Sequence, residues 1–302
     1  MMSENAREIY EVTEKDIIYD SEGECVEEQL LQGKSIESSL ACLELFHRRE
    51  MMLDPAPALT GILLEENPHH LPEKKQTRQQ REIVESVLAC FPEFLKKYGV
   101  TSRGLADPRN VFFIERKELK KISEELRIDE REVDGIYANG YVYLVDSGDG
   151  ILEALTIVHE AIHSKSFQSP KGLVRGISIF NPKDEHCYFW QIDEAVVEEL
   201  VMRFAKEYFP RIAVLSKKMQ DKKIDHADAI LYRMEKERNI LNGFITDMYE
   251  KSGSAFTSPE EIFTIFAKAV IAGEFSNLAA AIDKAYGRGA FVKLGIQTKQ
   301  KQ

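Results

Sequence analysis

The sequence has no run of apolar residues near the roughly 18 that crossing a bilayer requires, which argues against a membrane-spanning segment. It begins Met-Met-Ser-Glu-Asn-Ala-Arg-Glu and lacks the apolar core of a signal peptide. Basic residues are outnumbered, with 40 Lys and Arg against 51 Asp and Glu, and the net charge of −11 disfavours nucleic acid and anionic membranes as partners. We therefore expect a cytoplasmic protein, although export by a signal not recognisable in the sequence stays open.

Cysteine is also scarce. The four cysteines (Cys25, Cys42, Cys90 and Cys187) form no C-x-x-C pair, which argues against a zinc ribbon and against a disulfide framework. Few, scattered cysteines are typical of a reducing compartment. What remains is the composition of an ordinary globular protein, and its 302 residues suffice for one large domain or two modest ones.

Helical periodicity dominates the first hundred residues. Apolar residues recur at helical spacing over residues 35–53 and again over 78–98, and a polar stretch at 65–75 with two prolines separates them as a linker. We therefore predict a helical N-terminal region over residues 1–100.

The pattern changes after Pro108 to a mixture of strands and helices. Asn139-Gly140 is the strongest hairpin signal, because this dipeptide favours positive φ at both turn positions. The predicted elements are a strand at 111–114, a helix at 117–126, a hairpin at 135–145, a helix at 151–167, a loop at 167–190, a helix at 191–208, further helices to about 284 including a long charged one at 225–251, and a frayed tail at 297–302.

The helix predicted at 151–167 contains His159-Glu160-Ala161-Ile162-His163. Positions i and i+4 share one helix face, so both imidazoles can reach a single metal ion. The carboxylate of Glu160 lies beside that face, where it can act as the base for a water that zinc has acidified.

A chance match on an exposed helix is the alternative interpretation. With seven histidines in the chain, the motif would arise by accident in roughly a few per cent of such sequences. Apolar residues surround the motif, so its helix should be buried, and the preceding hairpin offers an edge strand that could hold an extended peptide. This context favours the metal site.

A catalytic zinc normally has a third protein ligand. Position 169 is Ser169, which excludes the long metzincin signature, and Glu194 is the better candidate. Glu194 and Glu198 share one face of the helix at 191–208, and burying both is costly unless they are paired with a cation or hydrogen-bonded. One glutamate binding the metal and the other orienting a ligand histidine would satisfy both, whereas the alternative is a solvated stripe of glutamates. Asp193 competes with Glu194 but points about 100° away from that face.

Over about residues 108–208, the sequence resembles the gluzincin branch of the zincin metallopeptidases, including its minimal scaffolds. The resemblance lies in the order of strand, helix, hairpin, H-E-x-x-H helix and E-x-x-x-E helix. It implies His159, His163 and Glu194 as zinc ligands, Glu160 as the base and Glu198 as the support of a ligand histidine. Ile162 departs from the glycine usual before the second histidine.

A gluzincin also needs a donor to the oxyanion, usually a Tyr or His near the metal. His186 and Tyr188, just before the second helix, are the candidates, with Tyr208 and His226 further downstream. His69-His70 is interpreted as an exposed pair, Trp190 as a core anchor and Cys187 as a packed thiol.

The predicted fold is α+β, with a zincin-like catalytic unit over residues 101–302 that includes a small sheet and a helical subdomain at 210–302. The predicted function is zinc-dependent hydrolysis of peptide bonds in a peptide or protein substrate. The alternative is a non-catalytic zincin-like metal-binding protein with a regulatory or interaction role; an intact Glu160 counts against it. The N-terminal region could also be a propeptide or a targeting module, which the activity of a chain beginning near Thr101 would test.

Overall fold

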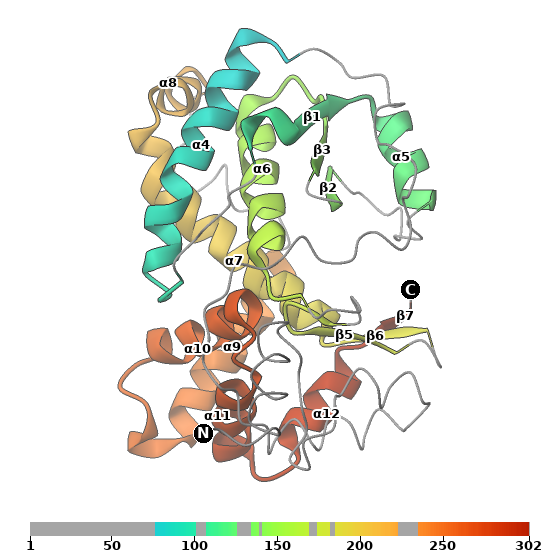
Figure 1. Cartoon of the computed structure of the whole chain (residues 1–302). Coiled ribbons are helices and arrows are strands. Elements are labelled where there is room, and N and C mark those ends of the chain that lie inside the picture. The colour runs from blue at the N-terminus through green and yellow to red at the C-terminus, as the bar shows by residue number, and fades with distance from the viewer. Residues whose placement is uncertain are drawn as a thin grey trace, which may run out of the picture. The chain divides into compact units, whose positions relative to one another are not determined.

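The computed structural model describes residues 76–100, 107–125, 134–138, 141–168, 174–181, 185–222 and 235–301. These residues form two compact units. The motif unit contains the described residues of 60–165 and 197–238, and the C-terminal unit contains those of 166–196 and 239–302. Both mix helices with short strands (Figure 1), so the expected mixed α+β class is confirmed.

Several predictions fall outside the described residues. These are the helix at 35–53, the linker at 65–75 with His69-His70, and the first ten residues of the helix predicted at 225–251, which include the oxyanion candidate His226. The division of the chain near residue 100 stays a prediction as well.

In the motif unit, the predicted strand, hairpin and helices are present with bounds close to those expected. Its elements are α4 (Arg78–Lys96), η3 (Pro108–Asn110), β1 (Val111–Ile114), α5 (Arg116–Glu125), β2 (Gly135–Ala138), β3 (Tyr141–Val145), α6 (Gly150–Lys165), most of α7 (Trp190–Tyr208), η4 (Phe209–Arg211) and α8 (Ala213–Asp221).

The sheet of the motif unit has the strand order β1-β3-β2. β1 pairs with β3 in parallel, and β2 pairs with β3 antiparallel, as the hairpin prediction requires. β2 therefore lies at the edge of this sheet.

The two faces of the sheet are covered by different helices. Leu119 of α5 packs in a cluster with Ile114, Ile136 and Tyr143, which all point to one face. Gly135 approaches α6 on the other face, as alternation along a strand requires. α6 in turn lies between the sheet and α4 (Figure 1).

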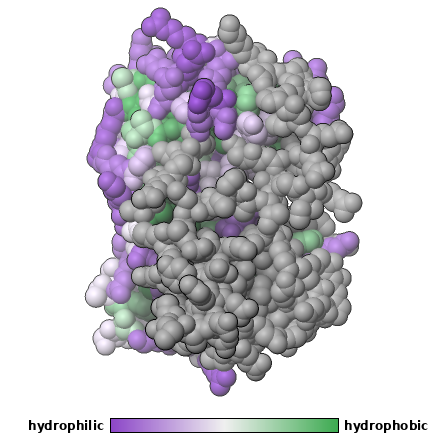
Figure 2. Space-filling model, viewed as in Figure 1, coloured by the Kyte–Doolittle hydropathy of each residue, from purple (hydrophilic) through white to green (hydrophobic). Residues whose placement is uncertain are grey.

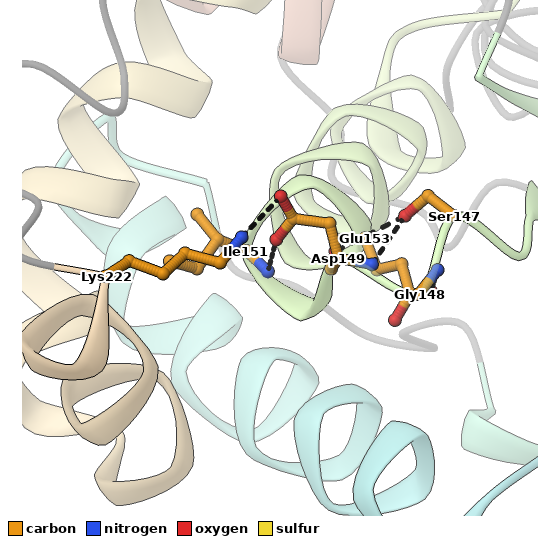
Figure 3. Close-up of polar contacts among 6 residues, drawn as sticks. All are labelled: Ser147, Gly148, Asp149, Ile151, Glu153 and Lys222. Atoms are coloured by element: carbon orange, nitrogen blue, oxygen red, sulfur yellow. Dashed lines mark hydrogen bonds and ion pairs between the residues drawn. The ribbon is translucent and has the colours of Figure 1, made fainter.

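Helix α6 is buried on nearly all sides, as the apolar residues around the motif predicted. Its N-terminus is capped by Asp149, whose Oδ1 accepts the backbone N–H of Ile151 at 3.1 Å (Figure 3). Lys222 donates to Oδ2 of the same carboxylate at 2.7 Å, and the backbone N–H of Gly148 donates to buried Glu153 at 3.1 Å. These bonds fix where the helix starts and hence the register of the motif.

An aromatic cluster holds α4 against α7. Phe94 makes edge-on contacts with Phe204 and Tyr208, at centroid distances of 5.3 and 6.2 Å. The outward side of α4 is charged, and hydrophilic side chains dominate the corresponding upper left of Figure 2.

The described part of the C-terminal unit combines helices with a second small sheet. Its elements are β4 (Val174–Arg175), β5 (Ser178–Asn181), β6 (His186–Tyr188), the start of α7, most of α9 (Glu235–Lys251), η6 (Gly253–Ala255), α10 (Pro259–Ala272), α11 (Phe275–Tyr286), α12 (Ala290–Gln297) and β7 (Gln300–Lys301).

This second sheet corrects two predictions. The segment 167–190, expected to be a loop, contains three antiparallel strands, and the tail, expected to be frayed, pairs as β7 with β6. Strands of two to four residues are too short to show an alternating pattern, and Gly176, at φ +57°, marks a turn between two strands. The pairing of His186 with Lys301 joins distant segments, so no local signal predicts it.

Two phenylalanines lie directly on glycines in the C-terminal unit. Phe167 packs on Gly273, which ends α10 at φ +67°, and Phe189 packs on Gly295 of α12. The helices were expected to end at about residue 284, but a further helix, α12, follows at Ala290–Gln297. These phenylalanine contacts pack a residue before β4 against the end of α10 and the residue after β6 against α12.

Candidate metal centre

Helix α6 brings the two histidines of the motif together. Nε2 of His159 lies 3.0 Å from Nε2 of His163, and the ring centroids are 4.6 Å apart. Two nitrogens bound to one zinc at about 2.1 Å in tetrahedral geometry would be separated by roughly 3.4 Å. The separation thus suits two ligands of one ion, although a hydrogen bond between the imidazoles would also explain it.

A carboxylate from α7 near both imidazoles favours the metal site. One oxygen of Glu194 and one nitrogen each of His159 and His163 all lie within 4.8 Å of one another, and this is a group that could hold a metal ion. His159 is buried, while His163 and Glu194 are half-buried. A hydrogen bond between two imidazoles does not need a carboxylate nearby, whereas a metal ion can use one as its third ligand.

Glu198 lies behind the first histidine, one turn after Glu194 on the same continuous helix. Its Oε1 is 2.9 Å from Nδ1 of His159, which places the buried carboxylate against this ring nitrogen. The side chain of Glu198 is only 1% exposed. The predicted division between the two glutamates, one toward the metal and one toward a ligand histidine, matches this arrangement.

Asp193 has a different partner. The backbone N–H of Ile177 donates to its Oδ1 at 2.7 Å, and Gly176 leaves room for the carboxylate because it has no side chain. Asp193 therefore stabilises the turn between β4 and β5 and, as expected, is not in the group with the two histidines.

Glu160 follows His159 on α6 and is 5% exposed. Its stem lies against the first residue of the edge strand β2, because a Cβ placed on Gly135 would come within 3.1 Å of Glu160 Cγ. In the motif unit, the edge strand β2 therefore lies next to the motif, as expected.

The oxyanion candidates lie on β6. The rings of His186 and Tyr188 are 6.4 Å apart, and Lys299 Nζ lies 5.7 Å from the centroid of the Tyr188 ring. Their catalytic roles stay predictions. Tyr208 is excluded, because fourteen residues of helix separate it from Glu194, or about 21 Å along the axis.

Cys187 is a packed thiol, as expected. It is 4% exposed, and burial, together with the nearby carboxylates of Asp193 and Glu194, raises the pKa of its thiol to about 12. The thiol is thus protonated at neutral pH and is a poor nucleophile.

Sequence reasoning missed an ion cluster next to Glu198. Glu199 accepts from Nε of Arg203 at 3.0 Å and from Nε of Arg238 at 3.2 Å, and Arg238 is 8% exposed. The spacing of Glu199 and Arg203 could have suggested their pair. Arg238 lies 39 residues from Glu199, and no local pattern points to it.

No family model matches the chain, and neither the curated proteins nor the solved structures include a match. Among the described helices, none is long and apolar enough to cross a membrane.

Proposed function

We propose that this protein is a zinc-dependent metallopeptidase of the gluzincin kind. The observation that carries the proposal is the grouping of one ligand atom each of His159, His163 and Glu194 within 4.8 Å of one another, with the buried Glu160 beside His159 on α6. Two imidazole nitrogens and one carboxylate oxygen are a donor set that catalytic zinc sites use, with a fourth position left for water or substrate.

Each residue of the group then has a distinct task. His159 and His163 would hold the ion through Nε2, and Glu194 would hold it through one carboxylate oxygen. Zinc, when bound, supplies Lewis acidity to the scissile carbonyl and lowers the pKa of a water. Glu160 would accept a proton from the attacking water as the new C–O bond forms, and would donate it to the amine nitrogen as the C–N bond breaks.

Glu198 fixes the state of the first ligand. By accepting a hydrogen bond from the N–H at Nδ1 of His159, it would keep the lone pair of Nε2 available for the metal and hold the ring in one orientation. A carboxylate this deeply buried would be costly without such a partner, which supports a role tied to His159.

The substrate expected for this site is an extended peptide. β2 ends the sheet of the motif unit, and its first residue lies against Glu160. An edge strand can pair with an extended chain through main-chain hydrogen bonds, which would present a peptide bond close to the base.

The test compares the wild type with Glu160→Gln. The wild type should bind about one zinc per chain and cleave peptides, lose activity to a chelator and regain it with zinc. Glu160→Gln should bind zinc equally well and lose about 10²–10⁴-fold in kcat, because an amide cannot accept the proton. New protein N-termini that form in cells with the wild type but not with the variant would identify substrates. Equal activity of the two proteins would refute Glu160 as the base.

A further inference from the structure

The edge strand reaches the motif helix through a residue without a side chain. A Cβ at Gly135 would lie 2.5 Å from Cγ2 of Thr156, 3.0 Å from Cδ2 of Leu144 and 3.1 Å from Cγ of Glu160. Carbon atoms in ordinary contact are about 3.5–4.0 Å apart, so no side chain fits here without movement of its neighbours. Steric crowding alone restricts this position, because Gly135 has no positive φ.

The neighbours cannot easily move. Thr156 and Glu160 are four residues apart on α6, so they face β2 together. The hydroxyl of Thr156 donates to the carbonyl of Leu152 at 3.0 Å, which fixes the rotamer and directs the methyl group at the strand. The stem of Glu160 is thereby confined between its own helix and the bare backbone of β2.

We propose that Gly135 is a positioning residue for the base. The missing side chain lets the backbone of β2 rest on the Glu160 stem, which sets where the carboxylate lies relative to His159 and His163. Proton transfer tolerates only about 0.5 Å of displacement, and an error of 1 Å costs about 100-fold. This inference rests on the proposed peptidase function.

Gly135→Ala should therefore lower kcat while leaving the metal in place. The Cβ must push Glu160 by a few tenths of an ångström, for which we expect about a fivefold loss of kcat. KM and the zinc dissociation constant should stay within about twofold of the wild type, because Glu160 is not a ligand.

A double variant separates the base from general packing. Thr156→Ser removes the closest carbon, Cγ2, but keeps the hydroxyl. Gly135→Ala with Thr156→Ser should regain part of the melting temperature that Gly135→Ala loses, yet keep the low kcat. If Gly135→Ala alone does not fold, the double variant is used for the kinetic test instead. Recovery of kcat together with stability would overturn the proposal.

Two glycines serve as matched controls in kinetics. Gly150→Ala crowds the start of the same helix, where a Cβ would meet Lys218 and Ile83 at 2.6 and 2.8 Å, but ten residues before Glu160. Gly243→Ala meets nothing within 4 Å. Both should keep kcat within about twofold. A loss for Gly150→Ala equal to that for Gly135→Ala would also overturn the proposal.

A structural measurement distinguishes failure of this inference from failure of the proposed function. If the zinc-loaded wild type cleaves no peptide, the peptidase proposal fails. Crystal structures of the wild type and the double variant still report on Gly135. The Glu160 carboxylate should move by at least a few tenths of an ångström, and an unmoved carboxylate would refute the positioning role.

Discussion

Removal of the carboxylate behind His159 tests the arrangement of the centre most directly. Glu198→Ala leaves His159, His163 and Glu194 in place and removes the contact of 2.9 Å between Oε1 of Glu198 and Nδ1 of His159. The imidazole then loses both the acceptor that selects its tautomer and the group that holds its orientation. Zinc affinity should fall, although no ligand is missing.

The magnitude follows from the burial of this pair. Loss of a carboxylate that supports a ligand histidine typically weakens metal binding about 10–100-fold, which corresponds to about 1.4–2.8 kcal/mol. A hydrogen bond to a charged group is worth about 1.5–3 kcal/mol, and Glu198, at 1% exposed, is poorly placed for water to replace it. Glu194→Ala should cost more, because a ligand itself is lost.

The assay is a competition titration of zinc against a chromophoric chelator at pH 7.4. Glu199→Gln is the matched control, since Glu199 is the next residue on α7, is 8% exposed, and contacts Arg203 and Arg238. It should keep the dissociation constant within about threefold. Unchanged affinity in Glu198→Ala, or an equal loss in Glu199→Gln, would refute the reasoning.

Three further predictions concern residues around the centre. Asp193→Ala should keep zinc affinity but lower stability by about 1–3 kcal/mol in thermal melting, because the buried N–H of Ile177 loses its acceptor; an emptied metal site would instead make Asp193 a ligand. Arg238→Met should destabilise the protein by about 1–3 kcal/mol in urea unfolding, because buried Glu199 loses the charged hydrogen bond from Nε of Arg238; no change would mean that this pair contributes nothing. Burial raises the pKa of Glu153, and Asp146 adds to this effect. The protonated form is therefore favoured in the folded state, and stability from this group is present at low pH and lost as pH rises through the folded pKa. Glu153→Gln should thus stabilise the protein at pH 7 and have less effect at pH 4 in urea unfolding; the opposite trend would contradict the raised pKa.

The local parts of the structure were predictable, and the non-local parts were not. α6, α7, β1 and the β2–β3 hairpin follow from periodicity and turn chemistry, which depend on neighbouring residues. The grouping of Glu194 with the two histidines was predictable because each helix fixes its own spacing, and the chemistry of a metal supplies the link between them.

The missed features all depend on contacts between distant segments. The strands of the second sheet are short and gain their stability from one another and from the helices they cover, so the glycines and prolines among them suggested a loop. Gly135 looked like an ordinary start of a strand, and only its distance to Thr156 and Glu160 shows why a side chain is excluded. Arg238 is paired through the fold alone.

The position of the histidines along α6 has an electrostatic consequence. The helix begins at Gly150 and ends at Lys165, so His159 and His163 lie in its last two turns. Backbone dipoles make that end of a helix negative and favour a cation there by about 0.3–1 kcal/mol, more where it is partly buried. Asp149 supplies the complementary negative charge at the other end. A divalent ion held by these side chains would therefore also stabilise α6 by offsetting the negative end of its dipole. Removal of the ion should then loosen the amides of the last turn in hydrogen exchange before it affects those near Asp149.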